Sequence, residues 1–171
     1  PPVPAVAEDR RTFEENAAKK AAVLAQALNK WVLADDSGLE VDHLNGAPGG
    51  LSHRYAGDPP DDAQNNRKLL AALEGVPTEK RGARFRCAIA LASPEGPVLS
   101  AEGSCTGSIA SAPRGDNDFG YDPVFFHAPL NRTFAELLPQ EKDRVSHRGT
   151  ALRAFLKQWQ AMFEEQRTAR G

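Results

Sequence analysis

Residues 84–92, near the middle of the chain, alternate between apolar and other side chains and constrain the fold more than any other segment. The apolar members occupy every second position: Phe85, Cys87, Ile89 and Leu91. This spacing puts them on one face of a β-strand. Residues 93–96 (SPEG) are typical of a turn, and residues 98–106 form a second extended run. The sequence therefore predicts a central β-hairpin.

Helical periodicity appears on both sides of this hairpin. Residues 12–29 carry apolar side chains at helical spacing, and Thr12 with Glu15 forms a capping-box signature at their start. A second helix is expected over residues 61–74, and a terminal helix follows Ser146. These segments predict three helices that each present an apolar face.

Shorter elements complete the pattern. Residues 31–34 read as a buried strand that a turn at residues 35–38 (DDSG) stops, and residues 123–126 read as another strand. A brief helix is expected after Thr133, ended by Pro139. Because helices interleave with strands, we expect a mixed α/β or α+β fold.

Charge and hydropathy exclude several classes of protein. The 21 basic and 23 acidic side chains give a net charge of -2, which argues against a surface built for duplex nucleic acid. No stretch approaches the 18 or so apolar residues that span a bilayer, and the proline-rich start lacks the apolar core of a signal peptide. Cys87 and Cys105 are too few and too far apart for a zinc site. We expect a cytoplasmic protein with two buried thiols.

Asp35 and Asp36 are the first candidate functional residues, because they follow an apolar strand and precede a glycine. Successive strand residues face opposite ways, so the two carboxylates are expected to have different roles. The competing interpretation is that one caps the turn and the other is solvated.

The first predicted helix adds a carboxylate and a cation. Glu15 either completes the cap with Thr12 or supplies a second carboxylate beside Asp36, in the oxygen-rich kind of site that Mg²⁺ prefers. Lys19 is placed to pair with Glu15, whereas Lys20 points about 100° away and is free to meet an anion.

The last helix opens with cations, against the helix dipole. His147 and Arg148 follow Ser146, and Lys142 lies just before. Free helix N–H groups with these cations suit a phosphate or an electron-rich carbonyl. The alternative is a solvated basic corner paired with Glu141 and Asp143.

Residues 119–122 combine aromatic rings, a glycine and an acid just before a strand: Phe119, Gly120, Tyr121 and Asp122. A planar base can stack on such rings while Asp122 accepts a ring N–H. Turn packing is the alternative.

Together these segments resemble a known family. The matching runs, in order, are residues 12–20 (TFEENAAKK), 34–42 (ADDSGLEVD), 46–49 (GAPG), 54–57 (RYAG), 119–125 (FGYDPVF) and 146–149 (SHRG), with Lys142 ahead of the last. They are similar to the inosine triphosphate pyrophosphatase family, from about residue 12 to the end of the chain.

The resemblance implies a fold and an assembly. The fold is a mixed α/β one, elongated and two-lobed, around a long mixed sheet with a central cleft, and the family usually forms homodimers. Residues 1–171 would form one nucleoside triphosphate pyrophosphatase domain. The family opens with a strand and a phosphate-binding loop that this chain lacks before Pro1, so the chain looks truncated at its amino end.

The resemblance also implies a reaction: Mg²⁺-dependent hydrolysis of ITP, dITP and XTP to the monophosphate and pyrophosphate. Asp36 would be the general base and, with Glu15, a metal ligand; Ser37 would contact substrate. Lys20 and Lys142 would bind phosphates. The remaining expected substrate contacts are Phe119, Gly120, Tyr121, Asp122, His147 and Arg148.

A physical argument agrees with this substrate class. Hypoxanthine and xanthine present a C6 carbonyl and an N1–H, which match donors at His147 or Arg148 and an acceptor at Asp122, whereas adenine would leave buried polar groups unpaired. Guanine shares both groups, so this argument does not exclude GTP. The alternative function is a nucleotide-binding fragment without turnover, which the absent phosphate loop suggests.

Overall fold

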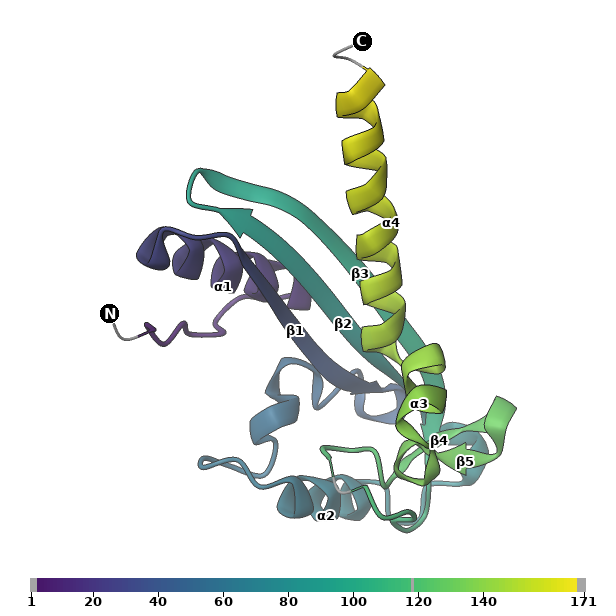
Figure 1. Ribbon diagram of the computed structural model, residues 1–171. Helices are drawn as coiled ribbons and strands as arrows, with labels where there is room; N and C mark the ends of the chain where they lie inside the picture. The colour runs from purple at the N-terminus through teal and green to yellow at the C-terminus, as the bar shows by residue number, and fades with distance from the viewer. Residues whose placement is uncertain (1–2, 118, 169–171) are drawn as a thin grey trace. The chain divides into compact units, whose positions relative to one another are not determined.

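The structure is a computed structural model that describes residues 3–117 and 119–168, with side chains through Glu164 (Figure 1). Five strands follow one another in chain order across one sheet: β1 (Val32–Val41), β2 (Gly82–Ser93), β3 (Gly96–Ile109), β4 (Phe125–His127) and β5 (Arg132–Thr133). The α-helices are α1 (Phe13–Leu28), α2 (Asp62–Ala72), α3 (Pro139–Val145) and α4 (His147–Thr168). The mixed α/β class is confirmed.

The chain packs as two compact units. Unit 1 contains residues 3–37, 87–103 and 147–168, and unit 2 contains residues 38–86 and 104–146, position 118 lying outside the described residues. Strands β1, β2 and β3 each contribute residues to both units. The two units agree with the two lobes that the family resemblance implied, while the elongated shape and the central cleft stay predictions.

The predicted central hairpin is present, and both of its strands are longer than expected. Only Pro94 and Glu95 separate β2 from β3, a connection that requires antiparallel strands. Strand β3 pairs antiparallel with β4, with Ser108 opposite Phe126, and β4 pairs antiparallel with β5. The parallel component of the expected mixed sheet is therefore not in these three pairings.

In unit 1, alternate side chains of β2 pack against two different helices. Ala88, Ala90 and Ala92 contact the apolar stripe of α1, which includes Ala17 and Ala21. The opposite face packs against α4 through a second cluster: Cys87, Ile89, Ala101, Ala151 and Phe155. Figure 1 shows α1 and α4 on opposite sides of these strands. This stretch of β2 is therefore covered on both faces.

The first helix begins and ends where its sequence predicts. The Thr12 hydroxyl accepts a hydrogen bond from Glu15 N, which satisfies one of the free amides of the first turn. Asn29 ends α1 in the left-handed conformation, with φ of 50°, and its backbone N–H bonds the carbonyls of the last turn. This fixed start and end position the polar side chains of α1 in unit 1.

Unit 2 is built around three phenylalanines that all contact one another. The ring centroid of Phe125 lies 4.5 Å from that of Phe85 and 4.8 Å from that of Phe134, and Phe85 and Phe134 stack at 5.8 Å. Leu39, Leu69 and other apolar side chains complete this core. Cys87 in unit 1 and Cys105 in unit 2 are free and buried, as predicted, and burial raises the pKa of each thiol to about 11.

Several local predictions were wrong. The strand expected at residues 31–34 is not buried, since Trp31 is 57% and Leu33 51% exposed. The turn expected at residues 35–38 is instead the middle of β1, because pairing with β2 and contacts of the two aspartates outweigh the turn preference of this polar segment. Pro139 does not end a helix; it is the first residue of α3, where its missing N–H costs nothing. The helix expected after Thr133 is a short 3₁₀ turn, Phe134–Glu136, with the capping box in place.

Along the described segments, none of the helices has the length and apolar character needed to cross a bilayer.

Candidate functional site

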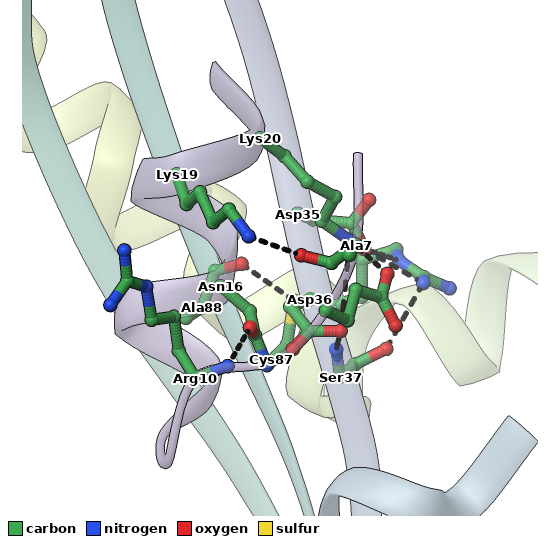
Figure 2. Close-up of polar contacts among 12 residues, drawn as sticks. Ala7, Arg10, Asn16, Lys19, Lys20, Asp35, Asp36, Ser37, Cys87 and Ala88 are labelled. Carbon is green, nitrogen blue, oxygen red and sulfur yellow. Dashed lines mark hydrogen bonds and ion pairs between the residues drawn. The ribbon is translucent and has the colours of Figure 1, made fainter. Parts of the chain in front are cut away.

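Asp36 lies in the middle of β1, with 9% of its surface exposed. Its Oδ1 accepts a hydrogen bond from Ser37 N at 3.1 Å, and Lys20 Nζ lies 3.6 Å from the same oxygen. Burial raises the pKa of the Asp36 carboxyl, while the Lys20 charge and a hydrogen bond from Asn16 act in the opposite direction. Figure 2 shows Lys20, Asn16 and Asp36 drawn together. The structure thus places a partly buried carboxylate with a raised pKa beside one cation.

Helix α1 supplies the groups around Asp36 from one of its faces. Asn16 and Lys20 are four residues apart and therefore neighbours on the helix surface. Lys20 Nζ also contacts Glu8 Oε1 at 2.8 Å, and Asn16 Oδ1 accepts from Arg10 N at 3.0 Å. Lys20, which was expected to meet an anion, thus contacts two carboxylates, those of Glu8 and Asp36. Asn16 was missed as a site residue, although its spacing from Lys20 was a signal for it.

Arg148, in the first turn of α4, binds the other carboxylate of the pair. Its Nη2 lies 2.9 Å and its Nε 3.2 Å from Asp35 Oδ2, and Nη2 lies 3.3 Å from Ser37 Oγ. Asp35 therefore offsets the cation that opposes the helix dipole. The alternative partner Glu141 instead pairs with Arg132 at 2.7 Å. Asp35 and Asp36 therefore have different partners, and their expected different roles stay a prediction.

Glu15 takes the structural role that the capping interpretation described, with one difference. Its Oε2 accepts a hydrogen bond from Arg11 N at 3.1 Å rather than from Thr12. The Glu15–Lys19 pair that the spacing suggested is replaced, because Lys19 Nζ bonds Ala7 O and Asp9 Oδ1. A metal-binding role for Glu15 stays a prediction.

The carboxylates near Asp36 are compatible with Mg²⁺ only if a bound polyphosphate supplies some of the other ligands. Within residues 3–117 and 119–168, no three or more His, Cys, Asp and Glu side chains gather as a metal cluster. A Mg²⁺ ion bound with a polyphosphate needs only one or two protein carboxylates, since phosphate oxygens and water fill its other positions. Asp36 fits that requirement because it is a buried carboxylate whose charge a cation would stabilise.

The predicted nucleobase loop, residues 119–122, lies in unit 2. Gly120 N donates to Asp62 Oδ2 at 2.8 Å, and Asn66 Nδ2 donates to Gly120 O at 2.8 Å. Tyr121 is buried, and its hydroxyl donates to Ser52 O at 2.7 Å. Burial raises the pKa of Tyr121 above its usual value. Tyr121 thus anchors the loop to its own unit.

The two ends of this loop differ in exposure. Phe119 is 62% exposed, so its ring is available for stacking, whereas Asp122 is 2% exposed. Lys142 Nζ, from α3, donates a hydrogen bond to Asp122 Oδ2 and lies 5.4 Å from the centroid of the Phe119 ring. Lys142, predicted as a phosphate contact, therefore sits beside the loop residues, and its charge offsets the buried carboxylate.

His147 is the buried first residue of α4, in unit 1. Its carbonyl oxygen and Ala151 N approach Gly103 of β3 so closely that a Cβ at residue 103 would overlap both. Glycine at that position lets the start of α4 pack directly on the strand.

The predicted site residues therefore form two groups. Unit 1 brings together Lys20, Asp36, Ser37 and Arg148, and unit 2 brings together the 119–122 loop and Lys142. His147 precedes Arg148 in unit 1, and Glu15 faces the chain before α1. Asp62 and Asn66 were missed because nothing in the sequence links α2 to a loop more than 50 residues away.

Sequence comparisons relate this chain to one protein family. The sequence profile of the Ham1 family matches residues 1–158. A dITP/XTP pyrophosphatase of Syntrophobacter fumaroxidans is 60% identical over 88% of this chain, which spans 64% of that relative's length, just under two thirds. A dITP/XTP pyrophosphatase of Desulforamulus reducens is 53% identical over 89% of this chain and 76% of its own length.

Solved structures of similar proteins point to the same family. The Staphylococcus aureus Ham1 protein has a TM-score of 0.83 and 42% identity, covering 95% of this chain and 81% of its own. A nucleoside-triphosphatase described as a dITP/XTP pyrophosphatase from Mycobacterium abscessus has a TM-score of 0.77 and 50% identity, covering 90% and 79%. With a family profile over nearly its whole length and relatives above 50% identity, this chain belongs to the Ham1 family.

Proposed function

We propose that this protein hydrolyses the deaminated purine nucleoside triphosphates ITP, dITP and XTP to the monophosphate and pyrophosphate, and so clears them from the nucleotide pool. The observation that carries this proposal is the shared name of its relatives, dITP/XTP pyrophosphatase, at 53–60% identity. We further propose a cytoplasmic homodimer that uses Mg²⁺. A nucleotide-binding module without turnover gains no support from these relatives.

The unit 1 group has the chemistry for the phosphate end of such a substrate. Asp36 is the proposed general base: its raised pKa makes it a better proton acceptor than an exposed aspartate. Lys20 and Arg148 supply positive charge for phosphate oxygens. Their present partners Glu8 and Asp35 are partly exposed, so exchanging them for phosphate costs little.

Asp36 is the residue that we propose holds Mg²⁺, with Glu15 as a second carboxylate. When bound with the triphosphate, the ion would neutralise charge on the phosphate oxygens. Asp36 would orient the attacking water, and Lys20 would hold the phosphate chain in line with it. Ser37, whose hydroxyl lies near Arg148, would add a contact to substrate.

The unit 2 group has the chemistry for the base. The exposed Phe119 ring offers a stacking surface, and the buried Asp122 carboxylate offers an acceptor for N1–H, a group that adenine lacks. Gly120 and Tyr121 shape the loop between them. Lys142, His147 and Arg148 are the proposed donors to phosphate and to the C6 carbonyl.

The deciding experiment incubates the full chain with ITP and Mg²⁺ and measures pyrophosphate and orthophosphate separately. We expect pyrophosphate, with kcat falling at least about 100-fold in Asp36→Asn, since positioned acid–base groups contribute at this scale. The matched control is Glu40→Gln on the same strand, where Glu40 pairs with Arg84, and it should retain activity. Release of orthophosphate, or full activity in Asp36→Asn, would contradict the proposal.

Substrate class and metal use need separate measurements. We expect kcat/KM for ITP and XTP to exceed that for ATP and dUTP by about 10⁴-fold if buried polar groups enforce the choice. A chelator should abolish turnover, and added Mg²⁺ should restore it. Tight ITP binding without product would support the binding module instead. Light scattering after size exclusion tests the homodimer.

A further inference from the structure

Helix α2 holds both backbone polar groups of Gly120, at the centre of the 119–122 loop. Asp62 Oδ2 accepts from Gly120 N, and Asn66 Nδ2 donates to Gly120 O, each at 2.8 Å. Asp62 and Asn66 are four residues apart, so one face of α2 provides both contacts. The adjacent Asn65 serves a different segment, since it bonds His53 O and Ala56 N.

Gly120 has the backbone freedom that makes such fixing necessary. Its φ is +57°, in the left-handed region, and apart from its two chain neighbours no atom of the described residues lies within 4 Å of where a Cβ would stand. Glycine adopts this region readily but also visits many other backbone states unless its peptide groups are held. The two hydrogen bonds from α2 hold the peptide groups of Gly120 itself, in addition to the turn bond from Asp122 N to Phe119 O and the Tyr121 anchor.

Asn66 makes its contact at a cost. It is 8% exposed, and its Oδ1 is buried with no hydrogen-bond partner in the part of the chain that is described. The reversed amide would place Oδ1 against Gly120 O, so the carbonyl of Gly120 fixes the orientation. A buried acceptor without a partner is unfavourable. Asparagine at position 66 therefore contributes the amide N–H that donates to Gly120 O.

We propose that Asp62 and Asn66 are positioning residues that hold the 119–122 loop in the conformation that recognises the deaminated base. This inference rests on the proposed function, and it assigns base selection partly to residues of α2. Phe119 directly precedes Gly120 and Asp122 follows it by two residues, so rotation about Gly120 would change the position of the stacking ring relative to the acceptor carboxylate.

The kinetic test compares Asp62→Ala, Asn66→Ala and the double variant in the full chain, with ITP and ATP as substrates. For Asp62→Ala, which removes a charge-assisted hydrogen bond, we expect KM for ITP to rise about 10-fold with kcat nearly unchanged. Asn66→Ala should raise it about fivefold. The ratio of kcat/KM for ITP to kcat/KM for ATP should fall in the same variants. The effect of the double variant on KM should be smaller than the two single effects combined, because either change releases the same loop.

Two control variants separate positioning from general damage to α2. Asp61→Ala removes the N-cap contact to Gln64 N but does not touch Gly120. It should lower the melting temperature without raising KM for ITP. Asp62→Asn keeps an acceptor for Gly120 N and should restore most of the affinity that Asp62→Ala loses. An equal rise of KM in Asp61→Ala and Asp62→Ala would overturn the proposal.

Hydrogen exchange of the Gly120 amide, measured by NMR without nucleotide, tests the anchor independently of turnover. We expect exchange about 10-fold faster in Asp62→Ala and unchanged in Asp61→Ala. If the wild type fails to cleave ITP, the proposed function fails alone, and calorimetric affinity for ITP replaces KM in the comparison. Unchanged Gly120 exchange, or faster exchange with wild-type affinity and selectivity, refutes the positioning role.

Discussion

At the scale of single residues, Arg81 of unit 2 shows how backbone carbonyls accommodate a buried charge. It is 7% exposed, and its guanidinium donates to three carbonyl oxygens: Leu73 O at 3.0 Å, Ile109 O at 2.8 Å and Ala110 O at 2.9 Å. Leu73 is the C-cap residue of α2, where the helix dipole is negative. One side chain thus joins the end of α2 to the end of β3.

Arg81→Met should lower the free energy of unfolding by at least about 2 kcal/mol, because it leaves buried carbonyl groups without donors. Chemical denaturation measures this loss. Arg81→Lys should recover only part of it, since an ammonium cannot reproduce the planar set of donors. Arg84→Met is the matched control: Arg84 is exposed and pairs with Glu40, so we expect a change within about 0.5 kcal/mol. Equal losses at the two positions would contradict this role.

At the scale of elements, the packing of α4 on β3 in unit 1 depends on Gly103. The His147 carbonyl and the Ala151 amide occupy the space where a side chain at residue 103 would begin. The same first turn of α4 carries Arg148, which binds Asp35 and Ser37 on β1. The contact between helix and strand therefore sets the position of a proposed phosphate-binding cation.

Gly103→Ala should destabilise the protein by about 1–3 kcal/mol, the usual cost of forcing extra volume into a packed interface. It should also lower kcat/KM for ITP, because the start of α4 must move. Thermal unfolding and steady-state kinetics measure the two effects. Gly50→Ala is the control, since within the described part of the chain no atom beyond its two neighbours lies within 4 Å of a Cβ there. A Gly103→Ala protein as stable and active as the control would show that the close approach is dispensable.

At the scale of the whole molecule, acid lowers stability through carboxylates that are bonded in the folded state. A hydrogen bond from Thr133 N lowers the pKa of Glu136 from its ordinary 4.5, and hydrogen bonds from Arg132 lower that of Glu141. A folded-state pKa below the unfolded value adds stability above about pH 4.5. That stability is lost as the pH falls through the folded pKa.

We therefore expect the melting temperature to fall between about pH 5 and pH 3. The double variant Glu136→Gln and Glu141→Gln should show a shallower fall, because its amides do not titrate in this range. Scanning calorimetry across this interval makes the comparison, and parallel curves for the two proteins would exclude these two carboxylates as the cause.

The sequence by itself determined the elements whose signals are local. Alternation at residues 84–92, the cap at Thr12 and the turn at residues 93–96 predicted the hairpin and α1, because pleating, capping and turn formation depend on near neighbours. The motifs also singled out Asp36 and the 119–122 loop as candidates for chemistry. Their assignment as site residues stays a prediction.

Only the tertiary structure decided which partners those residues have. It made residues 35–38 part of β1, paired Arg148 with Asp35 across 113 residues, and brought Asp62 and Asn66 to Gly120 across 58 and 54 residues. A hydrogen bond between distant residues forms only when the chain loses the conformational entropy of the loop between them. Burial of the whole core offsets this loss, so no local pattern of residues encodes such a contact.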